Sequence, residues 1–319
     1  ASGDTPLRDT TSSRTAASVC ARPALDPVFP LLAAVADDDR AAAVIRMAAT
    51  LARRRGAVPT VLRALGADQD VGGTTPSLMG TVAEDLLSPE YRDESRASLQ
   101  RLVADVAGEV QWRAETAQQS PADAIAERSR QMHAELIVMG LGRRGALDRA
   151  LSRDLLHAVV RSTRRPVLAV TPALRDLPGR VVVGIDFGEA SIRAAAIARH
   201  LLAPDGEMHL IHVSTDYPDT TDRWIGPIHR RGTGWVRQEL DYLIASLSPA
   251  SGMTVTSEVV DGDVKLSIEG CARRVNADLV AVGNDPRLRL GSFVSGSVSM
   301  ALAHEARWSM LIVPARNDV

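Results

Sequence analysis

The sequence predicts an α/β protein built from two tandem, doubly wound, parallel five-stranded sheets. Two observations predict this fold: short apolar runs alternate with Ala-rich helical stretches, and the whole order of elements occurs twice. Alternation of this kind specifies a parallel sheet with right-handed crossover connections. A length of 319 residues suits two domains, and an aromatic content of only 3% leaves Val, Leu, Ile and Ala to fill their cores.

The duplication is visible in two pairs of segments. Asp37 ends an apolar strand and precedes an Ala-rich helix, and Asp186 does the same 149 residues later. The segment Glu135-Leu-Ile-Val-Met-Gly140 has its counterpart in Asp278-Leu-Val-Ala-Val-Gly283, 143 residues further on. Two similar offsets across most of each half indicate that the second domain repeats the first.

Each half is expected to contain five strands separated by four helices. In the first half we expect strands at 31–36, 58–64, 110–117, 135–139 and 167–171, and helices at 40–55, 90–108, 121–133 and 149–163. In the second half we expect strands at 181–185, 208–213, 253–260, 278–282 and 309–313, and helices at 190–203, 233–248, 264–275 and 297–306. The segments 66–89 and 215–234 contain Gly and Pro and predict two long loops.

These elements set the expected domain limits. Residues 1–28 are expected to be a disordered tail, because they begin with a stretch rich in Ser, Thr, Asp and Arg. The first domain is expected at 29–173 and the second at 180–319. The linker between them is expected at 174–179, in a stretch with two prolines and a glycine.

Charge and cysteine usage exclude several classes of function. The net charge of -2, from 37 basic and 39 acidic residues, provides no field that would hold nucleic acid. Cys20 and Cys271 form no disulfide framework and no zinc-binding pattern, so a reducing, cytoplasmic location is expected. No apolar run reaches the roughly 18 residues of a membrane span, and none is predicted.

The second half contains the pattern of a phosphate-binding site. In an open parallel sheet, ligands bind beyond the carboxyl ends of the strands, here between the first and fourth strands of each half. Gly283 ends the fourth strand, and Gly296-Ser297-Val298-Ser299 opens the following helix. Glycine allows close approach of the backbone, and the free N–H groups at a helix start attract negative charge. Ser297 and Ser299 add hydroxyl groups that can donate to a phosphate.

This segment resembles the signature of the universal stress protein family. ATP-binding members of that family carry G-x2-G-x9-G-[S/T] between the fourth strand and the fourth helix. Gly283, Gly296 and Ser297 match three of the four positions, and Pro286 stands where the family has its second glycine. Because proline has no N–H group and fixes φ near about -65°, the loop shape or a phosphate contact is expected to change.

The resemblance extends along the second half. The segments 181–191, 209–213 and 260–264 are similar to the family's first strand, its second strand and the turn before its third helix. The resemblance implies a Rossmann-like strand order, 3-2-1-4-5, and binding of ATP or a related adenine nucleotide, with Mg²⁺ as its companion. It places adenine and ribose near Gly184, Ile185, Asp186, Val213 and Val282. It places the phosphates over Gly283, Gly296, Ser297, Val298 and Ser299.

The first half keeps the spacing of this motif but lacks its phosphate-binding residues. Counting thirteen residues from Gly140 reaches Arg153-Asp154, where the family has Gly-Ser. The spacing from Gly140 to the Pro166-Val pair before the fifth strand matches the family. Asp154 is expected at a helix N-terminus, where its carboxylate would occupy the place of a phosphate and repel it. The expected stoichiometry is therefore at most one nucleotide per chain.

Two alternatives to a nucleotide-binding stress or signalling protein remain open. The first alternative is that neither half binds nucleotide and that the chain is a scaffold for unknown protein partners. Pro286 and the Arg153-Asp154 pair favour this alternative. Otherwise the second half is a slow ATPase or a self-phosphorylating switch, with Asp263 and Asp285 near a metal ion.

No catalytic residue and no protein metal site is predicted, because the sequence contains no nucleophile elbow and no cluster with metal-ligand spacing. Asp186 also suits a cap at the start of the following helix. The two halves are expected to pack as an intramolecular pseudo-dimer, and a further homodimer remains open.

Overall fold

The computed structural model describes residues 29–66, 88–108, 112–142, 146–214, 233–247, 252–285, 289–290, 293–294, 296–305 and 307–315. The predicted tail at 1–28 lies outside these residues, as do most of the two predicted long loops.

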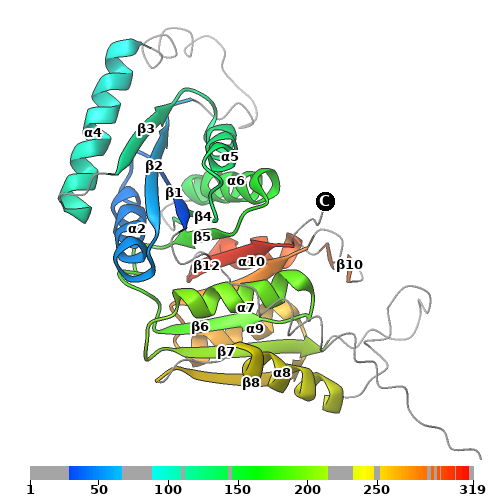
Figure 1. Cartoon of the computed structure of the whole chain (residues 1–319). Helices are drawn as coiled ribbons and strands as arrows, with labels where there is room; N and C mark the ends of the chain where they lie inside the picture. The colour runs from blue at the N-terminus through cyan, green and yellow to red at the C-terminus, as the bar shows by residue number, and fades with distance from the viewer. Residues whose placement is uncertain are drawn as a thin grey trace, which may run out of the picture.

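The first half alternates strands and helices in the predicted order (Figure 1). Its elements are β1 (Pro30–Val35), α2 (Ala41–Arg55), β2 (Val58–Ala64), α4 (Pro89–Ala107), β3 (Arg113–Ala117), α5 (Pro121–Gln131), β4 (Leu136–Gly140), α6 (Ala146–Thr163) and β5 (Val167–Val170). Most boundaries differ from the predicted ones by at most two residues, and the starts of β3 and α6 differ by three.

The second half repeats this order with one addition. Its elements are β6 (Arg180–Gly184), α7 (Glu189–Leu201), β7 (Glu207–Ser214), α8 (Thr233–Leu247), β8 (Thr254–Asp261), α9 (Val264–Arg274), β9 (Leu279–Asn284), β10 (Arg289–Leu290), β11 (Phe293–Val294), α10 (Gly296–Glu305) and β12 (Ser309–Pro314). The addition is the antiparallel pair β10 and β11, between β9 and α10. Each of these strands has two residues, too few for an alternating pattern to predict them.

The strands of both halves form one continuous ten-stranded sheet. Its order is β3-β2-β1-β4-β5-β12-β9-β6-β7-β8, which contains the predicted order 3-2-1-4-5 twice. All neighbours within each half are parallel. The two expected sheets are thus joined edge to edge.

The joint between the halves is the antiparallel pair β5 and β12. Leu168 lies opposite Leu311, with Ala169 opposite Met310 and Val167 opposite Ile312. Beyond the last pair, the backbone N–H of Thr171 donates to Ser309 Oγ at 3.1 Å, and both side chains are buried. Because each half contributes its fifth strand, the strands at the outer edges of the sheet are β3 and β8.

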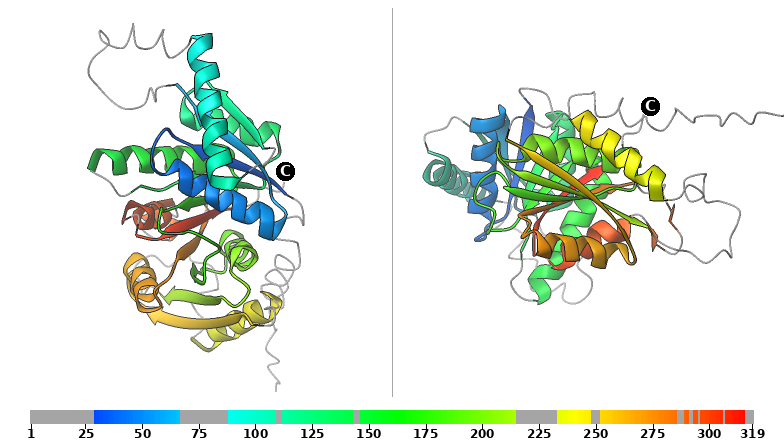
Figure 2. Two further views of the ribbon diagram at one scale, coloured as in Figure 1. Left: turned by 90° about the vertical axis from the view of Figure 1, so that its left-hand side faces the viewer. Right: turned by 90° about the horizontal axis from the view of Figure 1, so that it is seen from below.

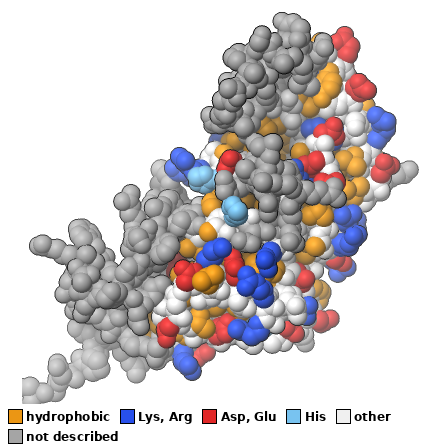
Figure 3. Space-filling view, turned by 180° about the vertical axis from the view of Figure 1, so that it is seen from behind, with side chains coloured by type: hydrophobic (Ala, Val, Ile, Leu, Met, Phe, Trp, Pro, Cys, Tyr) orange, Lys and Arg blue, Asp and Glu red, His pale blue; other side chains and the backbone are white. Residues whose placement is uncertain are grey.

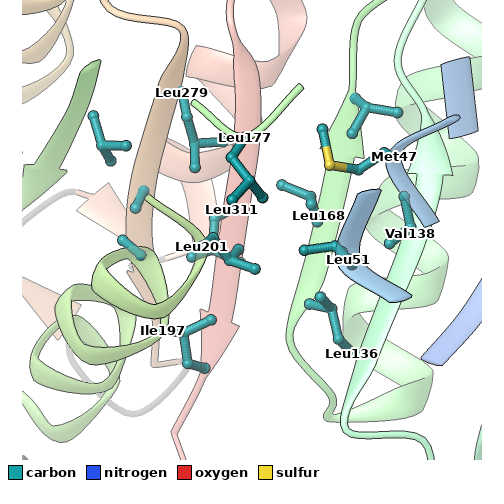
Figure 4. Packing of buried hydrophobic residues seen from close by; sticks show 14 of the residues in the cluster. Met47, Leu51, Leu136, Val138, Leu168, Leu177, Ile197, Leu201, Leu279 and Leu311 are labelled. Carbon is teal, nitrogen blue, oxygen red and sulfur yellow. The ribbon is translucent and has the colours of Figure 1, made fainter. Parts of the chain in front are cut away.

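Helices cover both faces of the sheet, and each layer spans both halves (Figure 2). One apolar cluster packs α2, α4, α7 and α8 on one face, and a second packs α5, α6, α9 and α10 on the other. Figure 4 shows the first cluster where it crosses the joint, with Met47 and Leu51 of α2 on one side and Ile197 and Leu201 of α7 on the other. The core is therefore shared between the halves.

Equivalent short polar residues start the third helix of each half. Ser120 Oγ accepts the N–H of Asp123 at 3.3 Å before α5, and Asp263 Oδ1 accepts the N–H of Leu266 at 2.8 Å before α9. A cap of this kind stabilises a helix by about 1 kcal/mol. The two caps lie 143 residues apart, the offset between the two fourth strands.

Within the described residues, no helix is both long and apolar enough to cross a membrane. On the face drawn in Figure 3, acidic and basic side chains are interspersed over the described residues. This distribution matches the near balance of charges in the sequence.

Candidate functional site

The carboxyl ends of β9, β6 and β7 lie side by side in the second half. Gly184 of β6 lies opposite Val282 of β9 on one side and Ile211 of β7 on the other. The sheet thus brings together the predicted positions Gly184, Ile185, Val213, Val282 and Gly283 at one edge. This edge lies where β6 and β9, adjacent in space, lead into helices on opposite faces.

Asp186 is exposed in the loop between β6 and α7. Its Oδ1 accepts the Ser191 hydroxyl at 2.5 Å and the backbone N–H of Gly188 at 2.8 Å. The residue at the N-cap of α7 is Gly188, so Asp186 supports the helix start from two residues before the cap. Its Oδ2 makes no hydrogen bond within the described residues and faces solvent.

An aromatic group lies directly beside Asp186, and the sequence did not predict it. The ring of Phe187 packs on His212 of β7, with ring centroids 5.0 Å apart, and on Trp235 of α8, with centroids 5.6 Å apart. His212 Nδ1 donates to the carbonyl oxygen of Ile185 at 2.8 Å. Because aromatic residues are scarce in this sequence, Phe187 and Trp235 could have been noticed. No spacing in the sequence, however, connects them with each other or with His212.

The backbone of Phe187 adopts the left-handed conformation, with φ of 60°. For a non-glycine residue this conformation costs about 1 kcal/mol, so contacts elsewhere must hold it. The rings of His212 and Trp235 supply those contacts. The aromatic group therefore fixes the path of the loop on which Asp186 lies.

Packing within the protein requires a glycine at Gly283 and leaves little room for a side chain at Gly184. A Cβ atom on Gly283 would lie 2.5 Å from the backbone nitrogen of Ser191 and 2.8 Å from the carbonyl carbon of Ala190. The first turn of α7 thus lies directly against the end of β9. A Cβ atom on Gly184 would lie 3.1 Å from the Ile268 side chain of α9.

Three of the apolar residues predicted near the ligand, Val213, Val282 and Val298, belong to one cluster, whereas Ile185 is buried in the cluster on the other face. In the cluster of the three valines, Val282 is buried together with Ile268 of α9, and Val213 and Val298 are partly buried against it. These side chains come from β9, α9, β7 and α10, on the face of the sheet opposite to the aromatic group.

Helix α10 begins at Gly296, the predicted position. Ser297 lies in its first turn, where N–H groups have no partner within the helix. Val298 is partly exposed, whereas Ser299 is 1% exposed and its hydroxyl group is turned away from solvent. Pro286, the departure from the motif, lies outside the described residues.

The described residues contain no group of three or more His, Cys, Asp or Glu side chains that could hold a metal ion. Asp263, named above as a possible metal neighbour, is the cap of α9. The thiol of Cys271 is buried, and burial, followed by the nearby carboxylate of Glu258, raises its pKa to about 12. A thiol of this kind is not a nucleophile at neutral pH.

The first half differs from this arrangement at the helix that follows β4. Helix α6 begins at Ala146, so Asp154 lies about two turns inside it and not at its N-terminus, as the sequence suggested. The segment 146–153 is rich in Ala, Leu and Arg, which favour helix. The equivalent of Gly296 in this half is therefore helical backbone without free N–H groups.

The pairing of Asp37 with Asp186 is also wrong. Ala34 and Gly184 occupy equivalent positions, because their partners on β4 and β9 are equivalent. Counting two residues on from each makes Ala36 the equivalent of Asp186. Asp38 makes the corresponding hydrogen bond, because its Oδ1 accepts the N–H of Arg40 at 2.8 Å, as Asp186 does from Gly188. The loop before α2 is longer, and this shifts the acidic residue along the chain.

Comparison with known proteins gives one family and several structures of similar fold. The model of the universal stress protein family matches residues 29–171 and again residues 178–314. A universal stress protein from Archaeoglobus fulgidus DSM 4304 is 17% identical, with a TM-score of 0.63, over 91% of this chain and 98% of its own.

Two structures from Pseudomonas aeruginosa are similar to the same extent. A putative universal stress protein from UCBPP-PA14 is 14% identical, with a TM-score of 0.58, over 93% of this chain and 95% of its own. A functionally unknown protein from PAO1 is 15% identical, with a TM-score of 0.60, over 93% of this chain and 94% of its own. At these identities the similarity concerns the fold. No curated protein matches the chain.

Proposed function

Because the chain is a tandem-domain member of the universal stress protein family, we propose that its second half binds ATP or a related adenine nucleotide in a stress-response or signalling role. The observation that carries the proposal is the meeting of three strand ends with the start of a helix. The ends of β9, β6 and β7 are adjacent, and α10 begins at Gly296 on the face where the apolar cluster lies.

In the proposed complex, the base and ribose lie at the strand ends. Val213 and Val282 provide apolar contact for the adenine ring, beside Gly184 and Ile185. The free Oδ2 atom of Asp186 accepts a hydrogen bond from the exocyclic amino group of adenine. The hydrogen bonds of Oδ1 to Ser191 and Gly188 hold the carboxylate in position for this contact.

The phosphates lie over Gly283 and the first turn of α10 in this proposal. The free N–H groups of Gly296, Ser297 and Val298 and the helix dipole attract the negative charge. Ser297 supplies a hydroxyl donor, and Ser299 contributes its backbone, since its side chain is buried. Mg²⁺, where present, would be held through the phosphates of ATP, as is usual for this ion.

The proposal assigns nucleotide binding to the second half alone. The first half has Ala36 at the position of Asp186 and helical backbone at the position of Gly296. It therefore lacks both the carboxylate for the base and the N–H groups for the phosphates. We propose the domain limits 29–173 and 180–319, a cytoplasmic location, and protein partners that respond to the nucleotide-bound state.

Calorimetric titration of the whole chain with ATP and Mg²⁺ tests the proposal. Changing Gly296→Asp together with Ser297→Ala places a carboxylate at the helix start, and we expect at least a tenfold loss of affinity. The matched control is Arg153→Asp with Asp154→Ala, at the equivalent positions of the first half, which is expected to bind ATP as the wild type does. Equal binding by the wild type and the Gly296→Asp, Ser297→Ala variant would exclude this site, and absence of binding by the wild type would favour the scaffold alternative.

A further inference from the structure

The first half contains a cavity of about 100 Å³ at the carboxyl ends of β1, β2 and β4. Ala34, Ala36, Leu62, Ala64 and Met139 line it from the strand ends. Ile125 of α5, Leu155 of α6 and Val44 of α2 line it from the helices. The cavity thus opens at the same place in the first half as the proposed nucleotide site in the second.

The correspondence between the two sites extends to individual positions. Strand register and the 143-residue offset relate Ala34 to Gly184, Ala64 to Val213, Met139 to Val282 and Leu155 to Val298. Each of these first-half residues lines the cavity. The first half has therefore kept the crevice while the polar contacts for a nucleotide have been replaced.

The chemistry of this cavity is aliphatic. Leu62, Ile125 and Met139 are each 3% exposed, and Ala34 is 8% exposed. Ala36 takes the position of Asp186, so the lining lacks the carboxylate that is proposed to bind the base in the second half. The charged side chains among the lining residues are Asp38 and Arg40, and the rest of the lining offers apolar contact.

An ion pair closes one side of the cavity. The guanidinium of Arg40 donates from Nε to Asp38 Oδ2 at 2.7 Å and forms a salt bridge with the same carboxylate through its terminal nitrogen. The aliphatic stem of Arg40 lies against Gly140, where a Cβ atom would come within 2.9 Å of Arg40 Cβ. Among the described lining residues, these two charges neutralise each other, so the lining adds no net charge that would select an ionic ligand.

We propose that the cavity of the first half is a binding site for a small, uncharged, apolar molecule. The chain would then combine an adenine-nucleotide site in one half with an apolar-ligand site in the other. A dry, Leu- and Ile-lined cavity of about 150 Å³ is large enough to bind benzene. The cavity here has about two thirds of that volume and opens at the carboxyl ends of the strands, so we take benzene as the upper size of ligand for it.

Benzene is the probe for the test, and the readout is methyl NMR of the full chain. With methionine methyl groups labelled with ¹³C, benzene is expected to shift the Met139 signal saturably, with a Kd of about 1 mM. Intermolecular NOEs from benzene to methyl groups of Leu62, Ile125 and Met139 are expected in the wild type. ATP is expected to leave the Met139 signal unchanged.

Two variants fill the cavity, and a third serves as a control. Ala64→Leu and Ala36→Leu each place a larger side chain among the lining residues, and the saturable shift of Met139 should disappear in both. Val58→Leu lies at the exposed start of the same strand as Ala64 and should keep the shift. Absence of a saturable Met139 shift or of NOEs in the wild type, or retention of the shift in either folded filling variant, would overturn the proposal.

Discussion

At the scale of single residues, the glycines of the signature have two separate roles. Gly283 is the last residue but one of β9, where a phosphate is proposed to lie, and its backbone also lies directly against the first turn of α7. Gly140 is in the same situation against Arg40 in the half that lacks the phosphate chemistry. The glycine near the end of the fourth strand is thus required by the fold in both halves, independently of any ligand.

A Gly283→Ala variant tests this structural role. Its Cβ atom would lie 2.5 Å from backbone nitrogen and 2.8 Å from backbone carbon, and backbone moves less readily than a side-chain tip. We expect the free energy of unfolding, measured with urea in the absence of nucleotide, to fall by about 1–3 kcal/mol.

The control for that measurement is Gly270→Ala on α9, where a Cβ atom meets nothing within 4 Å. Because alanine is the better helix former, this change should stabilise the protein by about 0.5–1 kcal/mol. Unchanged stability of Gly283→Ala would mean that the close approach of α7 to β9 does not constrain this position.

At the scale of elements, the difference between the halves lies in where one helix begins. Helix α6 starts seven residues earlier, relative to its strand, than α10 does. A helix start that is displaced by about two turns moves its free N–H groups about 10 Å along the axis. The first half is therefore proposed to lack the phosphate site because of this displacement, and not because of the charge of Asp154 alone.

Restoring the signature residues in the first half separates these two causes. Arg153→Gly with Asp154→Ser recreates the Gly-Ser pair of the motif but leaves it inside α6. We expect no second ATP site in calorimetry, and a loss of about 1 kcal/mol in stability from glycine within a helix. Appearance of a second site would show that sequence at these two positions, and not the helix start, excludes nucleotide.

The sequence predicted the alternation of elements well because apolar strands and Ala-rich helices differ clearly in length and period. It failed where the signal was local or ambiguous. The helix expected at 149–163 begins at Ala146, and the analogy with the second half places Asp154 at a helix N-terminus although the residues before it favour helix. The match of Asp37 with Asp186 comes from counting across loops that differ in length. The aromatic group around Phe187 depends on tertiary contacts between three elements, which no spacing in the sequence reveals.

At the scale of the whole molecule, the two halves form a single body. Strands β5 and β12 pair, and the cluster beneath α2 and α7 runs across the joint. Arg55 at the end of α2 donates to the carbonyl oxygen of Leu202 at 2.6 Å, which connects the helices of the two halves. Since both fifth strands are used in this joint, a further homodimer would need another surface.

The joint is expected to weaken in acid through His200. This residue lies on α7, with its ring edge-to-face against Phe29, and burial, then the charges of Arg55 and Arg199, lower its pKa. The unfolded chain then binds a proton more readily than the folded one. Stability should be full above the ordinary histidine pKa of about 6.5 and fall as the pH drops below it.

Urea unfolding of the wild type and of His200→Gln between pH 5 and 7.5 measures this effect. The free energy of unfolding of the wild type should fall below about pH 6.5, with a slope against pH that corresponds to less than one proton. The free energy of unfolding of the variant should fall less over the same range. A parallel pH dependence in the two proteins would mean that His200 does not respond to the neighbouring arginines.

The central claim is an asymmetric tandem protein, in which duplicated folds carry different sites. Equilibrium dialysis of the full chain against labelled ATP with Mg²⁺ tests it most directly, because it counts nucleotides per chain. We expect saturation at one nucleotide per chain. No binding at millimolar ATP, or saturation at two nucleotides per chain, would contradict it.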